Sequence, residues 1–112
     1  MTLTVSVVYV DELTGKLLDE IPLSQGDDLA GPERWRNSVY GSPESTKLGL
    51  SLLCSLKNED ILVQGSDVIA LKKEVTILLH ALDNAYPYSH RLGNIIRACD
   101  LAIEKKAAVW IA

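Results

Sequence analysis

Residues 107–111 constrain the fold of this chain more than any other segment, because they are apolar at a position where chains usually fray into water. The segment reads Ala-Ala-Val-Trp-Ile, which is too short for a helix and lacks a helical period. Valine, tryptophan and isoleucine are typical of strands, and a strand with so few polar side chains is stable only when it is paired and covered on at least one face. We therefore expect residues 107–111 to pair with the amino-terminal strand of a small sheet and to form part of the core.

The first part of the chain has the pattern of a β-hairpin. Residues 3–10 are rich in β-branched and aromatic side chains and predict a strand. The turn that follows, residues 11–16, contains Gly15, which can adopt a positive φ. Residues 17–23 predict the returning strand, and Pro22 places it at an edge of the sheet because proline cannot donate a ladder hydrogen bond.

A loop and two shorter helices are predicted next. Residues 24–31 are rich in Gly, Ser and Asp and indicate a loop, and residues 32–40 predict a helix of about two turns that begins at a proline. Ser42 is a candidate N-cap for a second helix over residues 43–57, which Gly49 weakens. The second half of that helix is apolar nearly all round, so we expect it to pack in the interior.

The last third of the chain predicts a short strand and two long helices. The strand covers residues 60–65, and Ser66 is the candidate cap of a helix over residues 67–84. Pro87 breaks the helical pattern, and Ser89 begins the final helix, which ends at the Glu-Lys-Lys run. Both helices carry apolar side chains at a spacing of three and four residues, and their connection is short. We expect them to pack as antiparallel neighbours on one face of the sheet.

Together these elements predict an α+β fold of two layers, in one domain that covers residues 1–112. The expected layers are a small, mainly antiparallel sheet of three or four strands and two long antiparallel helices packed against it, with a helical insert between the second and third strands. No apolar stretch reaches the roughly 18 residues that a membrane-spanning helix needs. The amino-terminus lacks the basic start and the small-residue cleavage site of a signal peptide, so we expect a cytoplasmic protein that does not bind membranes. Cys54 and Cys99 lie in apolar runs and predict free thiols.

Acidic residues are concentrated in the first third of the chain. Residues 1–33 hold seven acidic side chains and one lysine, a formal charge of −6, whereas the remaining residues carry +2. Six of the seven form three doublets: Asp11 and Glu12, Asp19 and Glu20, and Asp27 and Asp28. Such a surface repels nucleic acid and favours a basic protein partner. The alternative is that turns and solvated faces simply favour aspartate and glutamate.

The doublets converge if the first two flank the hairpin turn and the third lies on the loop that follows. Converging carboxylates can bind calcium or form the acid pair of a glycosidase. Residues 24–31 lack the alternating acids of an EF-hand calcium loop. A glycosidase pair can be drawn from any two carboxylates, so this pattern is not specific. A negative patch that receives a basic partner needs no tuned pKa, and it is the interpretation we favour. No metal site is expected.

Aromatic and basic residues at two places are candidate anchors for a partner. Trp35 lies between two arginines, directly after the acidic third. The connection between the two long helices carries the other candidates: Tyr86, Tyr88, His90 and Arg91. Both sets have a structural alternative, in which Trp35 packs on the domain while its neighbours pair with acids, and the tyrosine rings cover the ends of a core.

The sequence gives no indication of catalytic chemistry. Glycine-rich phosphate loops and the GxSxG, CxxC and HExxH motifs are absent. His80 shares a helical stripe with Asp83 opposite the leucine face, and we expect it to face water rather than to bind zinc. We therefore predict a protein that is not an enzyme, with no catalytic residue and no cofactor.

Two segments carry a resemblance to a known group of proteins. They are residues 35–82, which begin "WRNSVYGSPESTKLGL", and residues 91–112, "RLGNIIRACDLAIEKKAAVWIA". In size, element order and acidity the chain resembles small bacterial immunity proteins of polymorphic or contact-dependent toxin systems. The resemblance implies a small cytosolic protein that neutralises a toxin domain by tight binding, and it assigns no functional residue. The alternative is a self-associating domain, such as a homodimer, with a structural or regulatory role.

Overall fold

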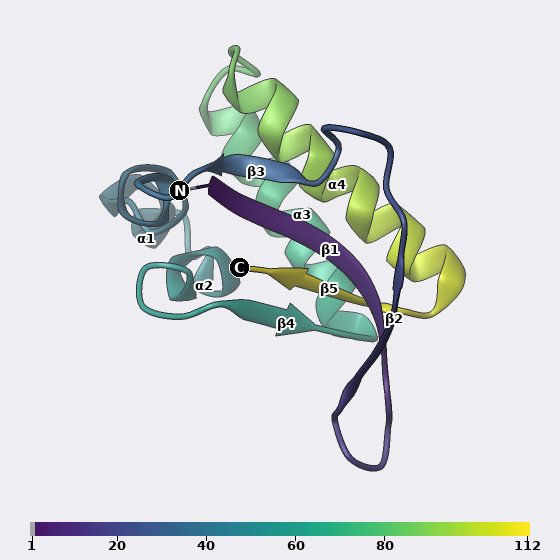
Figure 1. Cartoon of the computed structure of the whole chain (residues 1–112). Coiled ribbons are helices and arrows are strands. Elements are labelled where there is room, and N and C mark those ends of the chain that lie inside the picture. Colours follow the sequence, from purple (N-terminus) through teal and green to yellow (C-terminus); the bar gives the residue numbers. More distant parts are fainter. Residues whose placement is uncertain (1) are drawn as a thin grey trace.

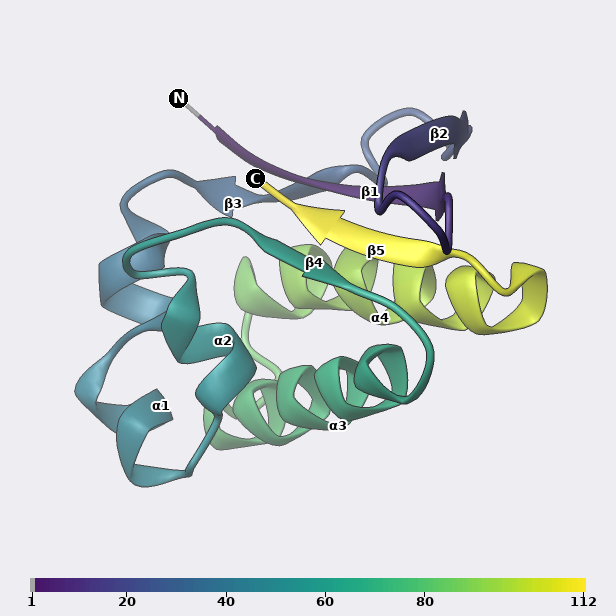
Figure 2. The ribbon, with the colours of Figure 1, turned by 90° about the horizontal axis from the view of Figure 1, so that it is seen from below.

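The computed structural model describes residues 2–112, and within them five antiparallel strands form one sheet (Figure 1). The strand order is β2-β1-β5-β4, and β3 pairs the first part of β1. The strands are β1 (Thr2–Val10), β2 (Leu17–Ile21), β3 (Leu29–Pro32), β4 (Ile61–Val63) and β5 (Ala108–Ile111). The two long helices lie on one face of this sheet (Figure 2), so the predicted two-layer α+β fold is confirmed.

β5 lies where its apolar sequence predicted, between β1 and β4. Ile111 faces Val5 of β1 on one side and Ile61 of β4 on the other, and it is fully buried. Just beyond the strand, Thr4 and Ala112 exchange backbone hydrogen bonds of 2.8 and 3.0 Å. The apolar segment is therefore a central part of the sheet and of the core, as expected.

The predicted β1–β2 hairpin is confirmed. Gly15 in the turn has a φ of +71°, and the Asp11 N–H donates to the Lys16 carbonyl oxygen at 2.9 Å. β2 is an edge strand, and four of its five residues are exposed. The end of the hairpin projects beyond the rest of the sheet in Figure 1, so both sides of this segment face water.

The loop predicted at residues 24–31 is wrong in its second half, because these residues run into β3. Pro32 is the last residue of that strand and not the first of a helix. The strand is held from both sides: it pairs with β1, and Asn94 Nδ2 donates to two carbonyl oxygens of this segment at 3.1 and 2.8 Å. The sheet therefore has one strand more than the three or four expected.

The helical insert between β3 and β4 begins with η1 (Arg36–Tyr40), a turn of π-helix. It starts four residues later than the helix predicted over residues 32–40, because Pro32, the first residue of that prediction, belongs to β3. Val39 and Tyr40 are buried, and the Tyr40 hydroxyl donates to the Ala30 carbonyl oxygen at 2.6 Å. This hydrogen bond connects the insert to β3. Burial raises the pKa of the Tyr40 hydroxyl well above its ordinary value.

The helix predicted over residues 43–57 is two short helices, α1 (Pro43–Lys47) and α2 (Ser51–Ser55). Ser42 caps the first one as predicted, since its Oγ accepts the third N–H of the turn at 3.2 Å. The chain breaks at Gly49, whose φ of +76° is outside the helical range. Three leucines of this segment are buried, at positions 50, 53 and 56, which agrees with the interior packing expected for it.

Two antiparallel helices form the second layer (Figure 2), α3 (Ser66–Ala81) and α4 (Tyr88–Lys105). Ser66 does not cap α3 as predicted: it is the first helical residue, and Gly65 with a φ of +61° occupies the cap position. The two helices bury the predicted apolar faces, represented by Val68, Leu71, Val75, Leu78, Leu92, Ile95, Cys99 and Ala102. Within residues 2–112, no helix is long and apolar enough to cross a membrane.

One cluster of apolar side chains joins the sheet, the insert and the long helices. Its largest fully buried members come from all of these elements: Tyr40, Leu3, Leu50, Leu53, Leu56, Leu71, Leu78, Leu92, Ile95, Ile111, Val5 and Val7. Close packing of such side chains gives the rigid support on which surface residues are held in fixed positions.

Candidate functional site

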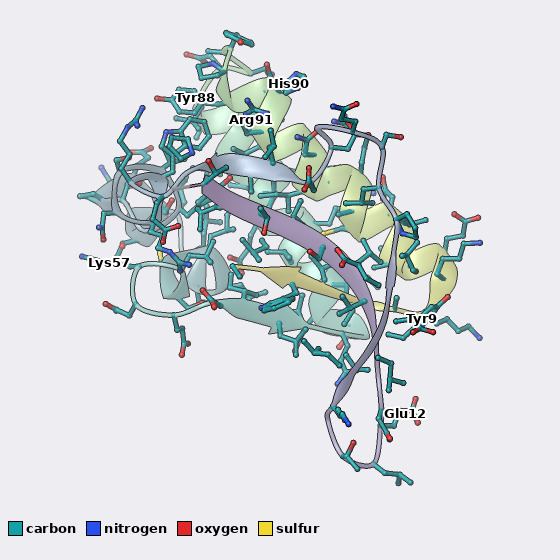
Figure 3. The ribbon with its side chains drawn as sticks, in the orientation of Figure 1. Tyr9, Glu12, Lys57, Tyr88, His90 and Arg91 are labelled. Carbon is teal, nitrogen blue, oxygen red and sulfur yellow. The ribbon has the colours of Figure 1, made fainter. Side chains whose placement is uncertain are left out.

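The three acidic doublets do not converge as one set. The first lies at the hairpin tip, where Figure 3 labels Glu12, whereas the second lies on β2 and the third on the loop before β3. Glu20 of the second doublet and Asp28 of the third line one hollow of about 460 Å³, whose remaining wall is formed by residues 22–26. We call this feature the acidic hollow.

Ordered backbone on both sides positions the two carboxylates of the acidic hollow. Glu20 lies opposite Val8 in the ladder between β2 and β1. The carbonyl oxygen of Asp28 accepts the Val5 N–H at 2.8 Å, and the Asn94 side chain binds the loop on either side of it. Because each carboxylate is carried by backbone bonded to β1, the sheet sets their arrangement.

The charge of the acidic hollow is not neutralised within the described part of the chain. Asp27 lies 3.9 Å from Arg97, whose guanidinium also donates to Asn94. Glu20, Asp28 and the neighbouring Asp19 have no ion pair within residues 2–112. Such an arrangement can accept hydrogen bonds from an ammonium or guanidinium group brought by another molecule.

Trp35 is not on the surface, because only 6% of it is exposed. Its ring packs against Tyr88 with a centroid distance of 5.1 Å and against Tyr40 at 6.3 Å. Gly31 lies against the same ring and leaves no room for a Cβ atom there. Of the two interpretations of Trp35, packing within the domain is the one the structure supports, and this residue is therefore withdrawn from the set of partner anchors.

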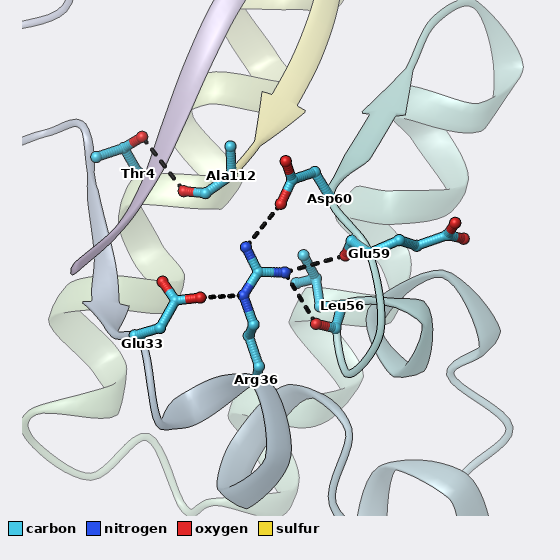
Figure 4. Close-up of polar contacts among 7 residues, drawn as sticks. All are labelled: Thr4, Glu33, Arg36, Leu56, Glu59, Asp60 and Ala112. Carbon is cyan, nitrogen blue, oxygen red and sulfur yellow. Dashed lines mark hydrogen bonds and ion pairs between the residues drawn. The ribbon is translucent and has the colours of Figure 1, made fainter. Parts of the chain in front are cut away.

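Arg36, next to that tryptophan, fastens three segments together (Figure 4). Its guanidinium donates to Glu33, to Asp60 at 2.6 Å, and to the carbonyl oxygens of Leu56 and Glu59 at 3.0 Å each. Hydrogen bonding to Asp60 raises the pKa of Arg36 above its ordinary value. With 17% of the side chain exposed and its donors engaged, this arginine holds the fold rather than a partner.

The helix connection holds the other predicted anchors, at the opposite end of the molecule from Glu12 (Figure 3). Tyr86 is 82% exposed and His90 is exposed, whereas Tyr88 and Arg91 are half-buried. Tyr88 packs against buried Trp35 with the two rings tilted by 39°, which fits the alternative in which a tyrosine covers the end of the core. The structure therefore does not bring these residues to the acidic hollow, and they form a separate surface.

The remaining reactive groups are dispersed. His80 is exposed, and residues 2–112 contain no group of three or more side chains placed to hold a metal ion. Cys54 and Cys99 are free thiols, and burial, with a contribution from Asp100, raises the pKa of Cys99 to about 12. A buried thiol with a raised pKa is a poor nucleophile.

Sequence analysis missed Asn94, the residue that holds the loop of the acidic hollow. It is 1% exposed on the buried side of α4, next to Ile95. A polar side chain on an apolar helical face is a usable signal, because a buried amide must find hydrogen-bond partners. Its partners lie 65 and 68 positions earlier in the chain, so the pattern alone does not identify them.

No protein-family model, no curated protein and no solved structure matches this chain.

Proposed function

We propose that this chain is a non-enzymatic protein-binding domain that receives a basic partner at the acidic hollow. The observation that carries the proposal is that Glu20 and Asp28, from two different elements, share the wall of one hollow without a cation to neutralise them in the described part of the chain. In keeping with the resemblance to immunity proteins, the partner we propose is a bacterial toxin domain, which the chain neutralises by direct binding.

Size and rigidity support a side-chain ligand at this place. A hollow of about 460 Å³ is large enough for the end of a lysine or arginine side chain and small for a folded ligand. The carboxylates are on backbone that is already ordered by β1 and α4, so binding loses little conformational freedom at the hollow. An arginine is favoured over a lysine, because its planar fork can engage two carboxylate oxygens at once.

The surrounding charge supports a protein partner over a nucleic acid. Asp19, Glu20 and Asp28 lack an ion pair within residues 2–112, and together they produce a negative field around the acidic hollow. Such a field repels phosphates and accelerates encounters with a basic protein, over a distance of about 8 Å at physiological salt.

The test uses the product of the adjacent gene. We expect this product to form a complex with the full chain on gel filtration. Where the product arrests growth, co-expression of the chain should relieve the arrest. The variant Glu20→Gln/Asp28→Asn should bind about tenfold more weakly and lose most of the salt dependence of the association rate. Glu44→Gln/Glu104→Gln is the matched control, since both residues are exposed and without an ion pair in the described part.

The two parts of the proposal fail separately. If no complex forms, the proposal of a toxin partner is wrong. If a complex forms and the Glu20→Gln/Asp28→Asn variant binds as well as the control variant, the acidic hollow is not the binding site.

A further inference from the structure

The hairpin carries exposed apolar side chains that the acidic hollow does not use. Leu13 at its tip is 95% exposed, Leu18 is 54% exposed, and Tyr9 and Leu17 are also exposed. We call residues 9–18 the hairpin arm. It projects from the sheet (Figure 1), and two-stranded hairpins of this kind are marginally stable without a covering surface. An exposed leucine at the tip of such an arm fits a docking element.

A second hollow of about 480 Å³ lies beside the hairpin arm, where the beginning of α3 meets the end of α4. We call it the end hollow. Its wall includes Val68, Ile69, Ala102 and Ile103, of which the two isoleucines are largely exposed. The hollow therefore offers apolar surface of the kind that a leucine side chain can cover.

The hairpin arm and the end hollow share a boundary, because Glu12 of the arm is itself part of the hollow's wall. Two patches that adjoin on one surface can each meet the other patch of a second copy across a two-fold axis. Such a contact is closed: both arms and both hollows are used, and none is left to propagate a fibre.

The charges of the two patches are complementary. The arm carries Asp11, Glu12 and one lysine, Lys16, and the end of α4 carries Lys105 and Lys106, the latter in the wall of the end hollow together with Glu12. None of these side chains forms an ion pair within residues 2–112. In a two-fold contact, the acids of each copy meet the lysines of the other copy. This favours a second copy of the chain over a partner that carries charges of one sign only.

From the shared boundary, the exposed Leu13 and the complementary charges, we infer that the chain forms a two-fold homodimer in which the hairpin arm of each copy lies in the end hollow of the other. Leu13 covers the apolar wall formed by α3 and α4, while the acidic tip meets Lys106 of the second copy. This inference is independent of the acidic hollow, which lies on another part of the surface.

Sedimentation velocity on the full chain over micromolar concentrations tests the dimer. We expect Leu13→Asp and Ile69→Asp each to weaken it at least tenfold, because either change places a charge in the apolar contact. Both positions are largely exposed within one chain, so the variants should fold, which far-UV circular dichroism verifies. Leu62→Asp is the matched control, since Leu62 is a 45% exposed leucine on β4 that belongs to neither the hairpin arm nor the wall of the end hollow.

A charge exchange between chains gives a readout that neither a general loss of stability nor a contact within one chain would produce. Glu12→Lys and Lys106→Glu should each weaken the dimer, and an equal mixture of the two variant chains should restore it, because opposite charges then meet only across the contact between copies. An equal mixture of Leu13→Cys and Ile69→Cys chains should form a disulfide-linked dimer on a non-reducing gel.

Several outcomes overturn the inference. They are a chain that stays monomeric throughout the micromolar range, a dimer that Leu62→Asp dissociates while Leu13→Asp does not, and an equal mixture of the Glu12→Lys and Lys106→Glu chains that does not regain the dimer. The Glu20→Gln/Asp28→Asn variant should leave the dimer unchanged, so failure here and failure of the toxin-binding proposal are distinguishable.

Discussion

Replacing Gly31 by alanine combines two separate penalties at one position of β3. The φ of Gly31 is +108°, a conformation that residues with a side chain rarely adopt. A Cβ atom built there would lie 2.3 Å from Cε3 of Trp35, more than 1 Å inside ordinary contact. The indole has little freedom to move away, because Tyr40 and Tyr88 pack against it.

The magnitude follows from adding the two penalties. A positive φ in a residue other than glycine costs about 1–2 kcal/mol. Forcing one extra carbon into a packed core costs about 1–3 kcal/mol. We therefore expect Gly31→Ala to lower the free energy of unfolding by about 2–5 kcal/mol, a large share of the 5–15 kcal/mol typical of a domain.

Two matched variants separate the penalties. Gly15 has a φ of +71°, and a Cβ atom added to it would have nothing within 4 Å, so Gly15→Ala should show the backbone penalty alone. Gly41 has an ordinary negative φ, but a Cβ atom would lie 2.6 Å from the Arg36 carbonyl oxygen, so Gly41→Ala should show the steric penalty alone. Urea unfolding followed by far-UV circular dichroism measures all three. If Gly31→Ala is no more destabilising than Gly15→Ala, the argument that Trp35 is held rigidly against β3 is refuted.

Two further changes probe other parts of the structure. Arg36→Lys should lower the free energy of unfolding by about 2 kcal/mol, because an ammonium group cannot donate to Glu33, Asp60 and two carbonyl oxygens together. Arg34 is exposed, so Arg34→Lys should change the free energy of unfolding little. Equal effects of the two variants in urea unfolding would contradict the role given to Arg36. The raised pKa of Cys99 predicts that stability falls as pH rises above 9.0, the ordinary pKa of the thiol, because the unfolded chain then loses a proton that the folded chain keeps up to about 12. At pH 10 this loss is on the order of 1 kcal/mol, and Cys99→Ala should make the decline between pH 8 and pH 10 shallower. Parallel profiles for the two proteins, measured with a reductant present, would refute this prediction.

The strands that could be predicted are those whose own side chains favour a strand. Residues 107–111 combine valine, tryptophan and isoleucine, and β5 is found there. β3 has the sequence Leu-Ala-Gly-Pro, which has no such preference. It is extended because β1 pairs with it and Asn94 binds it from α4, and these partners are distant in the chain. Tertiary contacts of this kind do not appear in a local pattern.

The candidate site was predicted in composition but not in arrangement. The acidic doublets were visible in the sequence. That Glu20 and Asp28 line the same hollow depends on the course of the loop between β2 and β3. Trp35 had two open interpretations, and the decisive fact is the position of Gly31 and the tyrosine rings around it. The exposed leucines of the hairpin arm gave no periodic signal, because β2 presents four of its five residues to water.

The position of β5 between β1 and β4 also determines how the chain must fold. Thr4 and Ala112, which bond to each other next to this strand, are 108 positions apart. β1 can find β2 early, across a short turn, whereas β4 has no neighbour in the described sheet except β5. Closing a loop of that length costs entropy before any contact rewards it, and contacts between distant parts of a chain slow folding for this reason. β5 is thus the strand that links β4 to the β1–β2 hairpin, and until it is in place the edges of β1 and β4 that it covers are left without a partner.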